Sequence, residues 1–454
     1  MFQRDLEKHL VIWSKRKDRK PLVLRGARQV GKTTVVETFS KQFDQYIYLN
    51  LEILEDRKIF ESDYTFDELL TALFLFKDWS KSINNTLIFI DEIQNSPKAV
   101  SSLRYFYEMA GNYFVIAAGS LLETLIDKTI SFPVGRVEYL VLRPCSFKEF
   151  LGAMNEMGLI NVLQEIPIPS YAHEKLMNLF RYYTLIGGMP EAVQKFIESK
   201  DIHSLNHVYE SLVISYLDDV EKYARNNTLS GIIRFVIEHS FSFAGSRIKF
   251  QGFGNSKYKY REMSEAFRTL EKALLVQLVY PVTDTRLPVT PAMARAPKLQ
   301  LVDTGLVNYM AGLQKSVFGS RVLSDVYEGR IAEHITGQEI LGSKPSFLFK
   351  LNFWTREKND ASAEVDFVYP FHDLVIPVEV KSGSAGKLRS LNEFMDRSPH
   401  PYAVRIYSGM PRTEPLYTRT GNKYSLLNLP FYLVHKLDAY LDWFTRKEAT
   451  KSQK

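Results

Sequence analysis

One octapeptide limits the fold of this chain more than any other feature. Residues 26–33 read GARQVGKT and match the pattern GxxxxGK[ST]. The apolar run 22–24 precedes the octapeptide, and a helical stretch at 34–41 follows it. A strand, this pattern and a helix in succession are typical of a phosphate-binding loop. The sequence therefore predicts an α/β domain with a phosphate site after its first strand.

The residue types in this loop suit a nucleoside triphosphate. Glycines let backbone N–H groups surround the phosphates, a lysine reaches the β and γ oxygens, and a hydroxyl binds Mg²⁺. Lys32 and Thr33 supply the last two groups. We therefore expect ATP and Mg²⁺ as cofactors, with nucleotide contacts from Gly26, Ala27, Arg28, Gln29, Val30, Gly31, Lys32, Thr33 and Thr34.

Two carboxylates follow a second apolar run. The run 87–90 leads directly into Asp91 and Glu92. A phosphate-binding loop works with an acidic residue that ends a neighbouring buried strand. We expect Asp91 to bind Mg²⁺ with Thr33, and Glu92 to accept a proton from the attacking water. The alternative, a buried strand that ends in solvated acids, is less favoured beside such a loop.

Two further residues are candidates for contact with the γ-phosphate. Ser120 follows the apolar run 114–118, where its hydroxyl would hold the water or the phosphate; an ordinary turn is the alternative. Arg136 offers a guanidinium, the group that stabilises transition-state charge on a transferred phosphoryl group. It is either a finger presented to a neighbouring subunit, which implies a homo-oligomer, or an ordinary surface arginine.

A second candidate site lies in the last third of the chain. Asp366 lies in the predicted strand 364–368, and the next strand carries Glu379 and Lys381. Alternate residues of a strand share a face, so these three side chains are expected to converge, with Glu333 as a fourth member. Asp366 and Glu379 are predicted ligands of Mg²⁺ or Mn²⁺, and Lys381 would position or deprotonate a water for phosphodiester cleavage. A structural ion pair is the alternative.

A basic stretch with aromatic residues occupies positions 243–261. It contains no acidic residue, and the whole chain carries 58 basic and 52 acidic residues. Such a stretch is typical of phosphate contacts and base stacking, so DNA or another nucleic acid is the expected partner. A solvated loop with aromatic anchors is the alternative. The residues concerned are Arg247, Lys249, Lys257, Lys259 and Arg261, with Phe243, Phe250, Phe253, Tyr258 and Tyr260.

The pattern along the chain predicts several parts. Short apolar runs alternate with amphipathic stretches in the first third, which predicts a parallel sheet covered by helices. Helical patterns continue through 147–225, with a break at 187–190. Two helical runs, 232–241 and 263–279, precede short extended pieces and indicate a winged helix. The last third returns to mixed α/β.

Short motifs along nearly the whole chain resemble a large family of bacterial and archaeal AAA-type ATPases with a C-terminal domain of unknown function. Besides the loop and the strands above, they are LRPCSFKEF at 142–150, GGMPE at 187–191, LVDTGL at 301–306, YEGR at 327–330 and EVDF at 364–367. The resemblance implies an α/β fold with an AAA-type P-loop domain at 1–150, a helical lid at 151–225, a winged-helix-like domain at 226–320, and a restriction-endonuclease-like domain similar to the PD-(D/E)xK nuclease fold at 321–454.

Composition narrows the setting. Hydrophobic residues make up 45% of the chain and charged residues 24%, as in ordinary folded proteins. A single cysteine, Cys145, excludes an internal disulfide, and we expect a cytoplasmic protein without membrane segments. The first hypothesis is an Mg²⁺-dependent ATPase that acts on nucleic acid and carries a metal-dependent nuclease site. The alternative is a nucleotide-dependent switch or scaffold whose C-terminal domain binds protein or DNA without cutting it.

Overall fold

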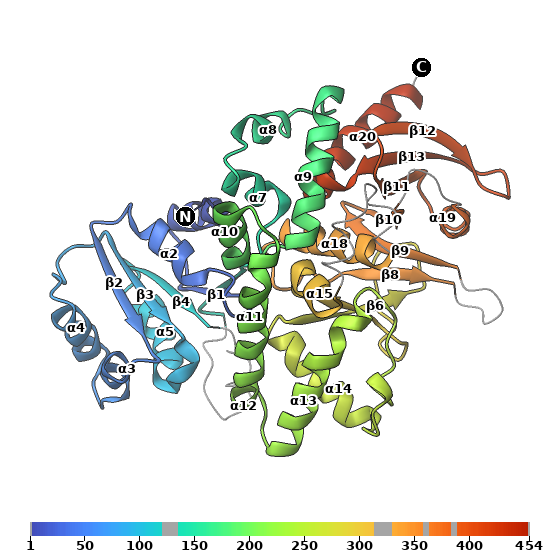
Figure 1. Cartoon of the computed structure of the whole chain (residues 1–454). Helices are drawn as coiled ribbons and strands as arrows, with labels where there is room; N and C mark the ends of the chain where they lie inside the picture. The colour runs from blue at the N-terminus through green and yellow to red at the C-terminus, as the bar shows by residue number, and fades with distance from the viewer. Residues whose placement is uncertain (1, 120–134, 313–328, 357–362, 383–387, 453–454) are drawn as a thin grey trace.

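The computed structural model describes residues 2–119, 135–312, 329–356, 363–382 and 388–452. Two sheets lie on either side of a central group of helices (Figure 1). Among the helices of these ranges, none has the length and apolar character needed to span a bilayer. The two sheets each form the centre of one part of the chain.

The N-terminal sheet is entirely parallel, as predicted. Its strands lie in the order β2-β3-β4-β1-β5. Alternate residues face two cores: Leu22 and Leu24 pack in one core with α1 and α2, whereas Val23 packs in the other with α3, α4 and α5. The elements are α1 (Leu6–Ser14), β1 (Leu22–Arg25), α2 (Lys32–Ser40), β2 (Gln45–Asn50), α3 (Leu54–Glu61), α4 (Phe66–Phe76), β3 (Thr86–Asp91), α5 (Pro97–Met109), β4 (Phe114–Ala118) and β5 (Glu138–Val141).

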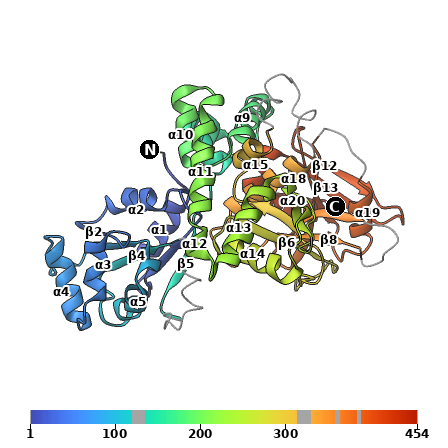
Figure 2. The same cartoon turned by 60° about the horizontal axis from the view of Figure 1, so that its bottom comes forward.

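Helices follow the first sheet, and the break predicted at 187–190 lies between two of them, at residues 187–189. Gly187 has a φ of +72°, and Pro190 begins the next helix. Figure 2 shows α11 and α12 standing between the N-terminal sheet and the C-terminal part. The helices are α7 (Phe147–Ala153), α8 (Met157–Val162), α9 (His173–Ile186), α10 (Pro190–Ser199), α11 (Asn206–Asp218) and α12 (Val220–Tyr223).

The expected helix at 263–279 is wrong at its C-terminal end. Helix α14 (Tyr260–Lys272) follows α13 (Asn227–Ser240), and residues 276–282 form strand β6 (Val276–Val282) instead. Leu274 has a φ of +61°, in the left-handed region that ends a helix. Every residue of β6 is buried, because β6 pairs with β7 (Lys298–Leu301) and with β8 (Asn352–Thr355). Apolar spacing alone did not separate these two structures.

The C-terminal sheet has eight strands in the order β12-β13-β11-β10-β9-β8-β6-β7 and is mixed. Because β6 pairs with β8, the sheet continues across the expected domain boundary at 320/321. The winged helix and the four-part division stay predictions. The remaining elements are α15 (Thr304–Met310), α18 (Gly329–Gly342), β9 (Glu364–Phe371), β10 (Leu374–Val380), α19 (Arg389–Met395), β11 (Tyr402–Tyr407), β12 (Arg412–Tyr417), β13 (Lys423–Pro430) and α20 (Leu437–Ser452).

Candidate functional site

The loop between β1 and α2 needs glycine at both ends of its motif. A Cβ on Gly26 would lie 2.5 Å from the carbonyl oxygen of Leu142, a distance that side chains do not tolerate. Gly31 has a φ of +91°, which favours glycine over any L side chain. The loop backbone therefore folds tightly against the chain that follows β5, and it leads directly into the N-terminus of α2.

Lys32 lies inside this loop. Its side chain is buried, with 7% of the residue exposed, and its Nζ donates to the carbonyl oxygens of Gly26 and Ala27, each at 3.1 Å. Burial lowers the pKa of Lys32, although the charges of Glu92 and Asp91 act in the opposite direction. The ammonium is thus held at the centre of the loop by the loop's own backbone.

The loop and the end of β3 meet, although they are far apart in sequence. The Thr33 hydroxyl donates to Asp91 Oδ2 at 2.7 Å. The backbone N–H of Glu92 donates to the other Asp91 oxygen at 3.0 Å. A hydroxyl and a carboxylate are hard oxygen donors of the kind that Mg²⁺ prefers, so these two side chains fit that ion.

Glu92 lies next to this pair and has a partner of its own. Gln94 Nε2 donates to Glu92 Oε2 at 2.5 Å. Burial raises the pKa of both Asp91 and Glu92 above the ordinary value of a carboxyl group. A buried carboxylate that a neighbouring amide orients suits the acceptance of a proton.

Helix α11 and the residues after it contact the outer side of the loop. The Arg28 guanidinium forms an ion pair with Asp219, and Gln29 Nε2 donates to Ser215 Oγ at 3.3 Å. Arg28 is therefore engaged by a carboxylate of the helical part. Ala27 and Val30 are buried, and Thr34 is partly buried.

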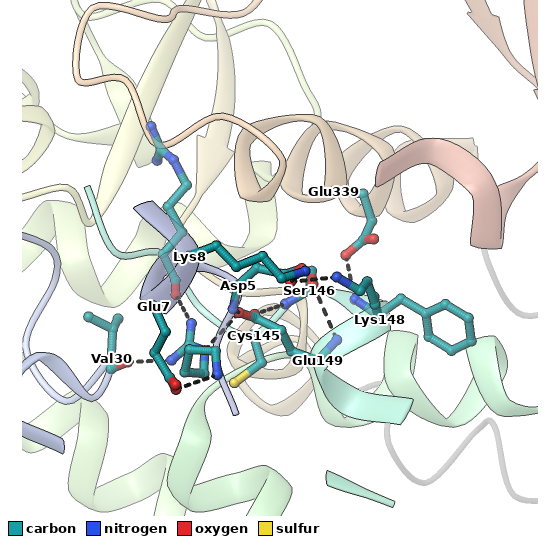
Figure 3. Close-up of polar contacts among 12 residues, drawn as sticks. Asp5, Glu7, Lys8, Val30, Cys145, Ser146, Lys148, Glu149 and Glu339 are labelled. Atoms are coloured by element: carbon teal, nitrogen blue, oxygen red, sulfur yellow. Dashed lines mark hydrogen bonds and ion pairs between the residues drawn. The ribbon is translucent and has the colours of Figure 1, made fainter. Parts of the chain in front are cut away.

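Arg4 also braces the loop and is not among the residues that the sequence patterns predict. Only 5% of Arg4 is exposed. Its Nη1 donates to the Val30 carbonyl at 3.0 Å, its Nη2 donates to the Arg143 carbonyl at 2.6 Å, and its Nε pairs with Glu149 at 3.1 Å. Figure 3 shows Val30 and Glu149 among the residues of this network of polar contacts. Local patterns give no signal for Arg4, because its partners are distant in sequence.

Ser120 and Arg136 are the two remaining residues predicted to contact the γ-phosphate. Ser120 lies outside the described residues; β4 ends at Ala118, between β1 and β3. The Arg136 side chain is 44% exposed, and its Nε pairs with Glu108 at 3.1 Å. Its action on a neighbouring subunit stays a prediction.

The predicted residues of the C-terminal site do lie together. Asp366 Oδ2 accepts the backbone N–H of Val380 at 2.7 Å, and Lys381 Nζ donates to Glu379 Oε1 at 2.6 Å. Burial raises the pKa of Asp366 and of Glu379. The nearby charge of Asp366 raises the pKa of Glu379 further. The D…ExK residues of β9 and of the end of β10 thus share one cluster, in which Glu379 is buried and Asp366 and Lys381 are partly buried.

A lysine that the sequence patterns do not predict occupies this cluster. Lys298 Nζ lies 2.5 Å from Glu333 Oε1, 2.6 Å from Glu364 Oε1 and 3.7 Å from Asp366 Oδ1. In the described part of the chain, no group of three or more His, Cys, Asp or Glu side chains is arranged to hold a metal ion. With Lys298 in this position, the predicted ligands Asp366 and Glu379 do not fit Mg²⁺ or Mn²⁺.

The basic stretch divides into an exposed and a buried set. Lys249, Lys257, Lys259 and Arg261 are exposed, and 52% of Tyr260 is exposed. The expected stacking role is wrong for Phe250 and Phe253, because both are buried and pack against Phe267 of α14. Arg247 is also engaged, since it pairs with Glu364 at 2.6 Å.

Family models match three successive parts of the chain. Residues 18–151 match the model of an AAA domain. Residues 177–317 match a domain of unknown function (DUF8612), and residues 328–424 match another (DUF4143). The parallel sheet, the loop and this match together define the N-terminal part as an AAA-type P-loop domain. The nuclease-like fold of the C-terminal part stays a prediction.

Comparison with curated proteins gave no match. Among solved structures, the chain is similar to the Walker-type ATPase paby2304 of Pyrococcus abyssi, with 14% identity, coverage of 68% of this chain and 96% of that chain, and a TM-score of 0.43. It is also similar to the Aeropyrum pernix ORC1 protein in complex with DNA, with 13% identity, coverage of 68% and 90%, and a TM-score of 0.29. A third similar structure is AMPPCP-bound DnaA from Aquifex aeolicus, with 11% identity, coverage of 59% and 86%, and a TM-score of 0.26.

Proposed function

We propose that this chain binds ATP with Mg²⁺ at residues 26–34 and hydrolyses it. The observation that carries the proposal is the contact between Thr33 and Asp91, which joins the phosphate-binding loop to the acidic end of β3. Lys32 lies beside both, held by loop carbonyls that an incoming phosphate oxygen would replace as its partner.

Each side chain has a distinct role in this proposal. Thr33 and Asp91 hold the metal, and Lys32 binds the β and γ oxygens. Glu92 takes a proton from the attacking water, while Gln94 keeps its carboxylate in place. Bound Mg²⁺ would supply charge neutralisation on the phosphates. Ser120 and Arg136 are proposed to contact the γ-phosphate, the latter from a neighbouring subunit.

The helical part is proposed to respond to the nucleotide. Arg28 and Gln29, within the loop, contact Asp219 and Ser215 at the end of α11. A change at the phosphates would therefore reach α11 through residues of the same loop that holds Lys32. This arrangement supports a conformational change in which ATP turnover moves the helical part relative to the C-terminal sheet.

Nucleic acid is the proposed partner, supported by four exposed cationic side chains between 249 and 261. The alternative from the sequence, a C-terminal domain that binds without cutting, is favoured for that domain by the position of Lys298 among its acids. We therefore propose an ATP-driven protein whose C-terminal domain serves as a binding module, and we retain the nuclease hypothesis as one to be tested.

The test is ATP turnover by Lys32→Ala beside wild type. Loss of a charge that stabilises the transferred phosphate should lower turnover by about 10²-fold or more. Lys41→Ala is the matched control, because Lys41 is an exposed lysine directly after the same helix. Turnover that Lys32→Ala leaves intact would refute the proposed function.

A further inference from the structure

The cluster at the C-terminal site contains a residue from a distant part of the chain. Lys298 is the first residue of β7, at the edge of the eight-stranded sheet, whereas Glu333 lies on α18 and Asp366 on β9. Its Nζ contacts carboxylate oxygens of Glu333 and Glu364 at 2.5 and 2.6 Å. The middle segment thus inserts its cation into the acidic site of the C-terminal part.

The charges around Lys298 explain why an ammonium is stable there. Only 5% of Lys298 is exposed, and burial of a lone charge would be costly. The carboxylates of Glu333 and Glu364, at 2.5 and 2.6 Å from Lys298 Nζ, offset that cost. The ammonium in turn neutralises acids that would otherwise repel one another.

A second, independent observation is a buried carboxylate oxygen at this site that has no hydrogen-bond partner among the described residues. Glu379 is buried, and its Oε2 accepts no hydrogen bond from any described residue, while its Oε1 takes Lys381. A buried carboxylate oxygen without a partner is costly. Glu379 directly precedes Val380, the residue whose backbone N–H donates to Asp366 Oδ2 at 2.7 Å.

We infer that Lys298 is an internal cation that holds the place of a divalent metal ion, and that this carboxylate site takes Mn²⁺ or Mg²⁺ only when the Lys298 ammonium is removed. The inference goes beyond ATP hydrolysis and does not depend on it. It replaces the expectation that Asp366 and Glu379 bind metal in the chain as it stands.

The distances support an exchange of one cation for another. Three carboxylate oxygens from three residues lie within 3.7 Å of Lys298 Nζ. Divalent ions bind oxygens at about 2.0 to 2.6 Å, so shifts of an ångström or so in these side chains would complete a metal site. Lys298→Met keeps an unbranched side chain and removes the ammonium, whose Nζ lies 4.9 Å from the centre of the Phe353 ring.

The experiment measures Mn²⁺ binding to the full-length chain by the loss of the electron paramagnetic resonance signal of free Mn²⁺. All proteins carry Thr33→Ala, without nucleotide, to weaken binding at the phosphate-binding loop. Lys298→Met in this background is expected to bind one more Mn²⁺ than the background does, with at least tenfold higher affinity at that site. Adding Asp366→Asn is expected to abolish the extra ion.

Two controls make the outcome decisive. Lys249→Met, at an exposed lysine of the neighbouring stretch, removes the same charge and is expected to add no Mn²⁺ site. Circular dichroism confirms folding, and Lys298→Gln replaces Lys298→Met if the latter does not fold. The inference is overturned if the background binds an Mn²⁺ that Asp366→Asn removes. It is equally overturned if the folded position-298 variant binds no more Mn²⁺ than the background.

Discussion

The two sites each place a buried lysine near carboxylates, with opposite results. Lys32 donates to backbone carbonyls of its own loop, so Asp91 is left to the Thr33 hydroxyl. Lys298 contacts the acids themselves. Burial lowers the pKa of Lys32, whereas the surrounding carboxylates raise that of Lys298 despite its burial. The carboxylates of a sequence motif are therefore available to a metal ion only when the nearby lysine side chains have other partners.

The two sites also differ in how their residues are distributed. The N-terminal site is built from two continuous stretches, 26–34 and 91–94, at the ends of the parallel strands β1 and β3 of one sheet. The C-terminal cluster draws on β7, α18 and β9 and on residues at the end of β10. Short motifs identify the first kind of site well, because its chemistry is local. Short motifs miss Lys298, the residue that decides the chemistry of the C-terminal cluster.

The largest expected effect tests the proposed base of the N-terminal site. Glu92→Gln should lower ATP turnover by about 10²- to 10⁴-fold, because the amide cannot accept the proton of the attacking water. ATP affinity should stay within about twofold, since Lys32 and Thr33 still bind the phosphates. Turnover and nucleotide binding are measured on the same preparation. Equal loss of binding and turnover would assign Glu92 a structural role.

The pH profile of wild-type turnover also tests whether Glu92 is the base. Burial raises the pKa of Glu92. The base must be ionised, so activity falls as pH drops through this raised pKa, at higher pH than for an ordinary glutamate near about 4.3. A profile of kcat against pH checks this. An acid limb that is unchanged in Glu92→Gln would show that another group titrates.

The next prediction concerns DNA binding by the basic stretch 243–261, whose Arg247 pairs with Glu364 of the C-terminal cluster. Replacement of Lys249, Lys257, Lys259 and Arg261 by glutamine should weaken duplex DNA binding at least about tenfold and flatten its salt dependence, because each lost phosphate contact reduces the slope by about 0.9. Fluorescence anisotropy at several salt concentrations measures both. Lys15→Gln with Lys17→Gln is the control, at two exposed lysines near the N-terminus and outside this stretch. Unchanged affinity would remove the 249–261 stretch from the proposal.

A smaller effect is expected at Arg4. Arg4→Ala removes two donors to backbone carbonyls, one of them on the phosphate-binding loop, and leaves Glu149 without its guanidinium. We expect the KM for ATP to rise about 5- to 30-fold, equivalent to roughly 1 to 2 kcal/mol, with a smaller change in kcat. Arg104→Ala is the control, since Arg104 is an exposed arginine. A folded Arg4→Ala protein with unchanged KM would contradict the bracing role.

The smallest effect is expected at Asp366. Asp366→Asn should leave ATP turnover within about twofold, because the two sites belong to different sheets and distant changes act independently. Supercoiled plasmid incubated with ATP and Mg²⁺ or Mn²⁺ should remain uncut by wild type and variant alike. Cleavage by wild type that Asp366→Asn abolishes would break the comparison and establish the nuclease hypothesis.

Much of the N-terminal sheet is predictable, because buried parallel strands appear as short apolar runs between turns. The predicted runs 22–24, 87–90 and 114–118 lie on β1, β3 and β4. Strand β12 (Arg412–Tyr417) is not predicted, since it is polar and largely accessible. The end of α14 is also missed, because the apolar spacing continues without interruption from the helix into β6.

The sequence by itself determined the phosphate-binding loop, its acidic strand and the parallel sheet, because the backbone conformations and chemistry that these require are set by residues next to one another. Only the tertiary structure decided which side chains meet across the fold. Arg4 reaches Val30 and Glu149, and Lys298 reaches Glu333 and Glu364. Charge partners are chosen by proximity in space, and burial makes each choice energetically important, so this part of the chemistry has no local signature.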